Sequence, residues 1–236
     1  MNNTLDNGFE QNFNAAMKMS LEEYDYESLL GFLRCGKIPE RQIAALKLNE
    51  IKSIEDAKIL VSNLTGQDGK VREAVSFKIN ELVKNTDYMP VFLDEKIFEI
   101  LIQGIMDING NVCRQIIEVI SNLKQNSCFR DYISKKLPES TKKILKKTAK
   151  LSSKDKQYVI SKRNFQLYWC LEALYDFVEH IDYKILKEII LKTAEFENYT
   201  IREKTAKILT KIDSPEFKEL KQKLKNDENY YVKRLL

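Results

Sequence analysis

Apolar residues recur at intervals of three and four along most of the chain, which predicts amphipathic helices. Three segments repeat one pattern: VREAVSFKINEL from Val71, VCRQIIEVISNL from Val112 and IREKTAKILTKI from Ile201. Each carries an apolar stripe at its first, fifth, ninth and twelfth positions, with Thr205 as the polar exception. The same helix face is therefore expected three times.

Weaker copies begin at Glu40 and Leu167, and a truncated copy begins at Val232, so successive copies start 31, 41, 55, 34 and 31 residues apart. Most of these spacings suit one helix pair per repeat. Partner helices are expected over Leu21–Cys35, Glu55–Leu64, Asp94–Ile108, Tyr183–Ala194 and Pro215–Lys225. Because one pair cannot bury its apolar stripe alone, the pairs must stack. We expect an all-α solenoid of about five to six antiparallel helix pairs.

Helix starts and stops carry specific signals. Ser20 with Glu23 forms a capping box, and Ser214 precedes a proline that suits the first helical position. Pro39 and Pro138 are expected to open helices in the same way. Glycines that mark expected helix ends are Gly36, Gly66 and Gly110.

The domain organisation follows from these patterns. Residues 1–19 are polar and are expected to be flexible, and residues 20–236 are expected to form a single repeat domain. The longest spacing contains an insertion at about 127–163. There we expect a basic helix over Glu139–Leu151, followed by a long helix from about Asp155.

Charge is unevenly distributed along a chain whose formal net charge is only +4. Residues 135–163 carry eleven Lys or Arg against Glu139 and Asp155, whereas residues 1–30 carry six acidic residues against Lys18. An uneven charge distribution of this kind bears on which partners the protein binds, and not on its fold. The basic run is either a solvated face or a site for a polyanion. Its candidate binding residues are Lys142, Lys143, Lys146 and Lys147.

The long helix carries a second stripe opposite its expected core face. Tyr158, Lys162, Phe165 and Trp169 align on that side, and Arg163 lies beside them. Aromatic rings interleaved with cations suit stacking on bases, on a planar cofactor or in the apolar groove of a partner. An interior solenoid helix can also be apolar all round. The stripe is therefore either buried between repeats or faces a ligand.

The start of each strong copy resembles the HEAT repeat, in which an apolar residue is followed by a basic one with an acidic residue shortly before. The carriers are Asp68 with Val71-Arg72, Glu197 with Ile201-Arg202, and Asp227 with Val232-Lys233. The nearest variety is the short bacterial repeat also found in phycobilisome lyases, and the resemblance covers about 38–125 and 181–236. It implies an armadillo/HEAT-like superhelix with an acid–base ladder between adjacent repeats. The ladder positions would be Asp68, Arg72, Arg114, Arg202 and Lys233, with Cys113 standing where arginine is usual.

A calcium-loop spacing occurs at Asp107, Asn109, Asn111 and Glu118, but Val112 stands where that loop needs glycine. Because the repeat pattern requires Val112 to be buried, we interpret this segment as a turn that caps the next helix.

Other catalytic and metal-binding patterns are weak. The segment from Gly66 to Lys70 lacks phosphate-loop spacing and is interpreted as a turn between helices. His180 is the only histidine and is expected near a helix C-terminus, and no HExxH or CxxC pattern occurs. Cys35, Cys113, Cys128 and Cys170 are expected to be reduced thiols. No metal, cofactor or catalytic residue is predicted.

The sequence favours a non-catalytic scaffold that presents a solenoid surface to a protein or peptide partner. The alternative is nucleic-acid binding through residues 135–163 and the stripe of Tyr158, Phe165 and Trp169. A helical-repeat DNA glycosylase and a bilin lyase are weaker enzyme alternatives. We expect a cytoplasmic location and no membrane partner, since the chain shows neither a signal peptide nor a long apolar run.

Overall fold

A computed structural model describes residues 4–149 and 156–236, and within these ranges the chain forms α-helices and short 3-10 turns without any strand. The all-α class expected from the sequence is therefore found throughout the described residues. Contacts divide the chain into two compact units, Met1–Gly104 with Asn109–Gln125 and Ile105–Ile108 with Asn126–Leu236. The boundary between the two units falls next to the segment predicted as an insertion.

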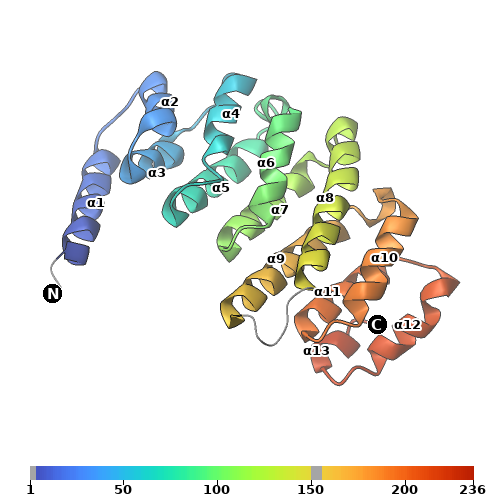
Figure 1. Cartoon of the computed structure of the whole chain (residues 1–236). Helices are drawn as coiled ribbons and strands as arrows, with labels where there is room; N and C mark the ends of the chain where they lie inside the picture. The colour runs from blue at the N-terminus through green and yellow to red at the C-terminus, as the bar shows by residue number, and fades with distance from the viewer. Residues whose placement is uncertain (1–3, 150–155) are drawn as a thin grey trace. The chain divides into compact units, whose positions relative to one another are not determined.

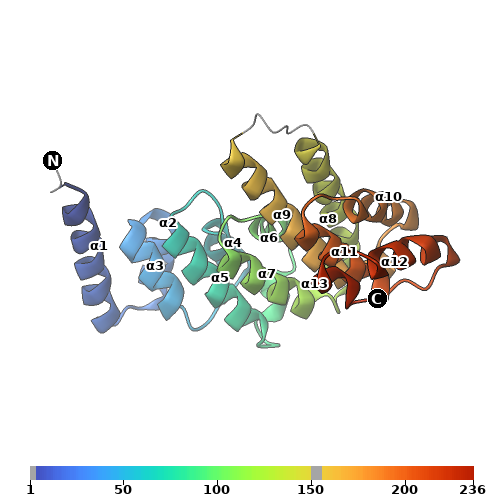
Figure 2. The same cartoon turned by 90° about the horizontal axis from the view of Figure 1, so that it is seen from below.

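Unit 1 consists of two layers of helices (Figures 1 and 2). One layer contains α1 (Thr4–Leu21), α3 (Ile38–Lys47), α5 (Gly69–Val83) and α7 (Gly110–Leu123), each packed on the next. The other contains α2 (Tyr26–Cys35), α4 (Ile54–Ser62) and α6 (Glu95–Ile105), with the 3-10 turn η1 (Met89–Phe92) before α6. This alternation is the stacking of helix pairs that the repeat pattern predicts.

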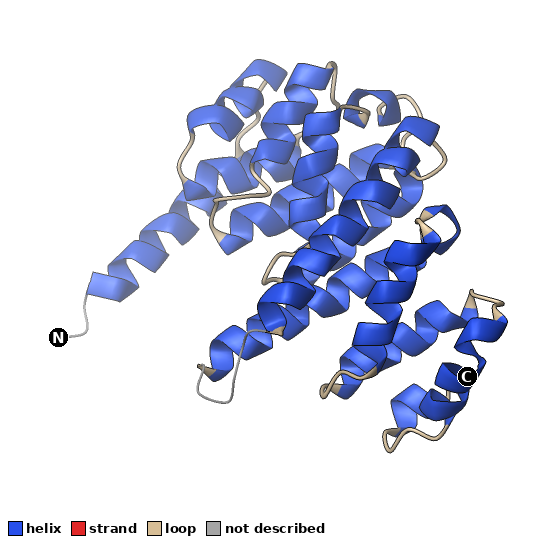
Figure 3. Cartoon of the chain, turned by 45° about the vertical axis from the view of Figure 1, so that its right-hand side comes forward, coloured by secondary structure: helices blue, strands red, loops and turns tan. Residues whose placement is uncertain are grey.

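Unit 2 also consists of alternating helices, and Figure 3 shows helices joined by loops in the described residues. The helices α9 (Gln157–Tyr175), α11 (Tyr199–Thr210) and α13 (Tyr230–Lys233) pack in sequence. Their partners are α8 (Ser127–Thr148), α10 (Tyr183–Ala194) and α12 (Lys218–Lys225), with the 3-10 turns η2 (Val178–His180) and η3 (Pro215–Phe217). The helices α3, α5, α7, α9, α11 and α13 are called the second helices below.

The repeated stripe forms the core. In α5, Val71, Val75, Ile79 and Leu82 are all buried, and the corresponding residues of α7 are buried too. Thr205 occupies a buried stripe position in α11 because its hydroxyl donates to the carbonyl of Ile201, which satisfies the polar atom inside the helix.

Side-chain caps position the starts of the second helices. Asp68, Asn109, Asn198 and Asn229 precede α5, α7, α11 and α13, and each accepts a hydrogen bond from the backbone N–H two residues later. These caps satisfy an N–H that the helix leaves unpaired. Asn109 therefore caps a helix, as the turn interpretation of the calcium-like spacing expected.

The N-terminal segment differs from its prediction. Residues 4–21 form α1, whereas a helix start was expected at Ser20. The next helix begins instead at Tyr26, after Asp25 accepts a hydrogen bond from the N–H of Ser28. The physical reason is tertiary, since α1 packs on α3 and buries Met19.

Two other boundaries also differ. Pro138, expected to open a helix, lies inside α8, and the predicted end at Leu151 lies outside the described residues. The helix continues through the proline because Phe129, Ile133 and Leu137 bury a stripe that extends to Ile144. Gly110, expected to end a helix, is the first residue of α7.

Candidate binding surface

The four candidate lysines lie on α8 but do not share one environment. Lys142 forms an ion pair with Glu188, which also pairs with Lys192 of α10. Hydrogen bonds from Lys142 and Lys192 lower the pKa of the Glu188 carboxyl to about 2. Lys143, Lys146 and Lys147 are exposed. One of the four lysines therefore also ties α8 to α10, and three form an exposed basic face.

The predicted aromatic stripe runs from an exposed to a partly buried end. The Tyr158 side chain is 66% exposed, whereas Phe165 and Trp169 are partly buried and lie edge to face with ring centroids 6.0 Å apart. The Trp169 indole nitrogen is buried without a hydrogen-bond partner. The stripe is therefore neither wholly buried nor wholly exposed.

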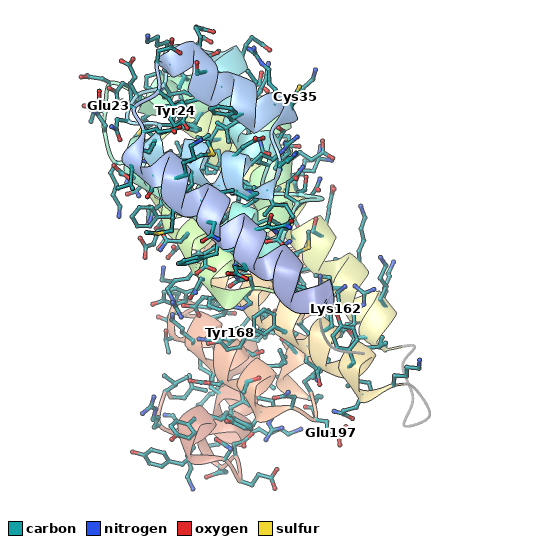
Figure 4. All side chains as sticks on the ribbon, turned by 90° about the vertical axis from the view of Figure 1, so that its left-hand side faces the viewer. Glu23, Tyr24, Cys35, Lys162, Tyr168 and Glu197 are labelled. Atoms are coloured by element: carbon teal, nitrogen blue, oxygen red, sulfur yellow. The ribbon has the colours of Figure 1, made fainter. Side chains whose placement is uncertain are left out.

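The cations of this helix are partly covered as well. Lys162 and Arg163 are half-buried, and Lys162 projects from the α9 ribbon in Figure 4. Arg163 donates to the side-chain oxygen of Gln166, which in turn donates to the carbonyl of Met106. Arg163 thus takes part in a structural chain of hydrogen bonds within unit 2.

The clearest ladder contact joins Arg202 at the start of α11 to Asp227 in the next repeat. Arg202 also donates through Nη1 to the carbonyls of Phe196 and Glu197, and Asp227 accepts from the N–H of Asn229. The hydrogen bonds from Arg202 lower the pKa of the Asp227 carboxyl below its usual value. One guanidinium therefore closes the turn before its own helix and fixes the turn of the next repeat.

A comparable set of hydrogen bonds surrounds Arg41 and was not predicted. Its guanidinium donates to the carbonyls of Leu33, Arg34 and Gly36 and to Oδ1 of the buried Asn63. Arg41 is the second residue of the weak copy at Glu40, the position that Arg202 holds in its own copy. The shared position of Arg41 and Arg202 within their copies could have revealed this set of hydrogen bonds. It was missed because the side chain that accepts from Arg41 is the amide of Asn63 at the end of α4, and not an acidic residue in a turn.

The remaining ladder positions are arranged differently. Asp68 caps α5, and Arg72 donates to the carbonyl of Gln67. Arg114 is exposed and lies 3.3 Å from Oδ1 of Asn111, and Lys233 is exposed in α13.

Polar networks also join neighbouring second helices. In unit 1, Asn80 of α5 is buried and donates to Gln115 and Glu118 of α7, while its Oδ1 has no partner. Glu73 of α5 accepts from Asn109 and Asn111. These contacts fix the side chains between the two helices.

In unit 2, Glu172 of α9 pairs with Lys204 and Lys207 of α11. Burial alone would raise the pKa of the Glu172 carboxyl, but the two lysines outweigh it and the pKa lies below its usual value. Lys204 lies 4.5 Å from the ring centroid of Tyr168, and Lys207 lies 4.5 Å from that of Tyr175. The interface between α9 and α11 is thus an alternation of cations, rings and a carboxylate.

Metal-binding groups, membrane-spanning helices and thiols were sought within residues 4–149 and 156–236. These residues contain no group of three or more His, Cys, Asp and Glu side chains arranged to hold a metal ion. No described helix has the length and apolar character needed to cross a membrane. The four cysteines are free thiols, with Cys113 and Cys170 buried, and His180 ends the short turn η2.

No family model matches the chain, and no curated protein matches it. Among solved structures, computationally designed armadillo repeat proteins for modular peptide recognition match at 13% identity, with a TM-score of 0.52 over 89% of this chain and 96% of that one. A designed armadillo repeat protein, YIII(Dq)4CqI, matches at 14% identity with a TM-score of 0.47 over 89% and 96% of the two chains. An engineered protein matches at 18% identity with a TM-score of 0.46 over 90% and 94%.

Together with the alternating layers of each unit, the first of these likenesses defines the class of protein. The chain is an all-α helical-repeat protein with an armadillo-like solenoid fold, and the HEAT-like resemblance of its sequence agrees at this coarse level.

Proposed function

We propose that the protein is a non-catalytic scaffold that binds a protein or peptide partner on the outward faces of its second helices. One observation carries this proposal. Leu46 of α3 and Phe77 of α5 stand 31 residues apart at the same repeat position, and both large side chains are exposed. Exposed apolar side chains repeated on neighbouring helices suit a partner that lies across several repeats.

The polar networks support the same proposal. Asn80 lies three residues after Phe77 on α5 and is buried, and its hydrogen bonds to Gln115 and Glu118 of α7 fix the side chains beside Phe77. Solved armadillo-like proteins designed for modular peptide recognition share the fold, which makes a peptide partner a reasonable expectation here.

The test is an affinity capture from native lysate with mass spectrometry, using the full chain and a Leu46→Ser/Phe77→Ser variant. Leu191→Ser is the matched control, because Leu191 is similarly exposed but lies on α10 in the other layer. The proposal expects a partner that is retained by the control and lost by the double variant. A partner retained equally by both proteins would contradict it.

A second candidate is nucleic-acid binding, favoured by the exposed Lys143, Lys146 and Lys147 and by exposed Tyr158. Phosphate contacts would make the affinity fall steeply with salt. The capture is therefore repeated after nuclease treatment. Loss of every partner after nuclease, together with loss of polyanion binding in a Lys143→Gln/Lys146→Gln/Lys147→Gln variant, would favour this candidate over the scaffold.

A further inference from the structure

The outward face of α1 leaves large apolar side chains in solvent. Phe13, Met17 and Leu21 are 55%, 49% and 83% exposed, and they follow one another at intervals of four residues. This spacing aligns them in one stripe along the helix. Within residues 10–21, whose burial the structure describes, only Met19 is buried. An apolar stripe of this extent on the described surface indicates contact with another protein.

The stripe borders a hollow between α1 and α3. This hollow has a volume of about 470 Å³, and its apolar walls are Phe13 and Met17 of α1 with Ile38, Pro39 and Ile43 of α3. Ile38 is itself exposed. Figure 2 shows α1 at the edge of the layer that it forms with α3, α5 and α7. A further helix laid in the hollow would therefore extend this layer and cover the stripe.

The stripe is complementary to itself when two copies of α1 run antiparallel. With a two-fold axis beside residue 15, Phe13 of one copy faces Met17 of the other, and Met17 faces Phe13. Each ring then packs on the flexible thioether of the other copy. Such a contact is isologous, because the same surface serves both copies.

The charges beside the stripe favour the antiparallel arrangement. Glu10 and Lys18 are exposed on one flank of the stripe, whereas Asn12 and Ser20 lie on the other. In an antiparallel pair, Glu10 of one copy lies on the same flank as Lys18 of the other, separated along the helix axis by about 3 Å. A parallel pair would instead place each charged flank against the uncharged flank of the other copy. Opposite charges therefore meet only when the helices are antiparallel.

Lys18 also lies 3.8 Å from Glu22 of its own chain. Both side chains are largely exposed, and an exposed pair of this kind contributes little to stability. The ammonium group of Lys18 therefore remains available to a carboxylate of a second copy.

The area of this surface is sufficient for a reversible dimer. Burying the exposed parts of Phe13, Met17, Leu21 and Ile38 in both copies would remove roughly 800 Å² of apolar surface from water. With the polar rim that accompanies such a core, the whole interface reaches about 1,200 Å², the lower end of the range for specific contacts. An interface of this size suits association in the micromolar range.

We propose that the protein forms a two-fold symmetric dimer in which the α1 helices of two copies pack antiparallel. Phe13 and Met17 form the centre of the contact, each α1 covers the hollow between α1 and α3 of the other copy, and Glu10 pairs with Lys18 at both ends. This inference goes beyond the partner binding proposed above and does not rest on it.

The first test is sedimentation equilibrium of the full chain at protein concentrations from about 5 to about 500 µM. The parent should pass from monomer to dimer over this range, and Phe13→Ser/Met17→Ser should dimerise at least about tenfold more weakly. The matched control is Ile54→Ser/Leu191→Ser, which replaces two similarly exposed apolar side chains on α4 and α10. The control should dimerise as the parent does, and circular dichroism checks that each variant keeps its helical content.

The second test reverses the charges at two exposed positions and so does not depend on the apolar contact. Glu10→Lys should weaken the dimer about threefold, because it places an ammonium group near Lys18 of the other copy. Adding Lys18→Glu to this variant should restore the dissociation constant of the parent to within about twofold.

Three results would each overturn the inference. The first is a parent that stays monomeric over the whole concentration range. The second is equal dimerisation of the parent and Phe13→Ser/Met17→Ser. The third is a Glu10→Lys variant that dimerises as the parent does, or that Lys18→Glu fails to rescue, since either outcome excludes the antiparallel pairing.

Discussion

Arg202 and Asp227 are joined by two hydrogen bonds across successive repeats, from Nε to Oδ2 at 2.7 Å and from Nη2 to Oδ1 at 2.9 Å. Their side chains are only 11% and 8% exposed. A parallel pair of charge-assisted hydrogen bonds fixes both distance and orientation. The contact therefore determines how the turn before α13 sits on α11.

Replacing Arg202 with alanine should lower the free energy of unfolding by about 2 to 3 kcal/mol, because Asp227 would remain nearly buried without its counter-charge. Urea unfolding followed by circular dichroism measures this change. Arg202→Lys should recover only part of the loss, since an ammonium cannot reproduce the paired geometry. Arg114→Ala is the control at an exposed position and should change stability by less than about 0.5 kcal/mol. Equal effects of Arg202→Ala and Arg114→Ala would contradict the assignment.

The same pair predicts a dependence of stability on pH. Hydrogen bonding to Arg202 lowers the pKa of Asp227 below its ordinary value of 3.8 in the folded protein, so the unfolded chain takes up the proton more readily. This stabilisation is present above pH 3.8 and is lost as the pH falls from there through the folded pKa. As the pH is lowered from neutral into the acid range, the free energy of unfolding should therefore fall less steeply for Asp227→Asn than for the parent protein. Asp213→Asn, at an exposed site, should follow the parent curve.

Two glycines of the first helix pair should respond oppositely to alanine. A Cβ on Gly36, at the end of α2, would lie 2.5 Å from the carbonyl oxygen of Phe32, whereas a Cβ on Gly31 would meet nothing within 4 Å. Gly31→Ala, inside α2, should raise the free energy of unfolding by about 0.5 to 1 kcal/mol because glycine is a poor helix former. Gly36→Ala should lower it. Thermal unfolding checks both, and a destabilised Gly31→Ala would contradict the packing described.

Thiol labelling should separate the cysteines into two pairs. Cys35 and Cys128 are exposed, whereas Cys113 and Cys170 are buried. Burial raises the pKa of the Cys170 thiol to about 12, and its hydrogen bond with Thr141 offsets only part of this. In native protein, Ellman's reagent should therefore titrate two thiols rapidly, and the others only after denaturant is added. A Cys35→Ser/Cys128→Ser variant should show no rapid phase, and rapid labelling of all four thiols in the parent would contradict the buried assignment.

The periodicity of apolar residues predicted most of the helix pairs, because each helix forms where one apolar stripe becomes buried. The helix α10 has the bounds predicted for it, Tyr183–Ala194, since its stripe is regular and Asp182 caps it. The failures have tertiary causes. The helix α1 gains its apolar contact from α3, which its own polar sequence does not reveal. Pro138 is accommodated inside α8 because the stripe on both sides of it is buried.

The candidate site was less accessible from the sequence. The exposure of Lys143 could be anticipated from its position in a basic run, but the pairing of Lys142 depends on Glu188, a residue 46 positions later.

The hydrogen-bond sets around Arg41 and Arg202 have a consequence for how such a chain can change its length over evolution. Each set closes within one turn and reaches no farther than the next repeat, at Asn63 and Asp227 respectively. A duplication or deletion of whole repeats therefore affects only the hydrogen bonds between the repeats at the cut, and leaves the sets in the other repeats unchanged. The uneven spacing of the copies, from 31 to 55 residues, agrees with repeats whose length can change without breaking the contacts of their neighbours.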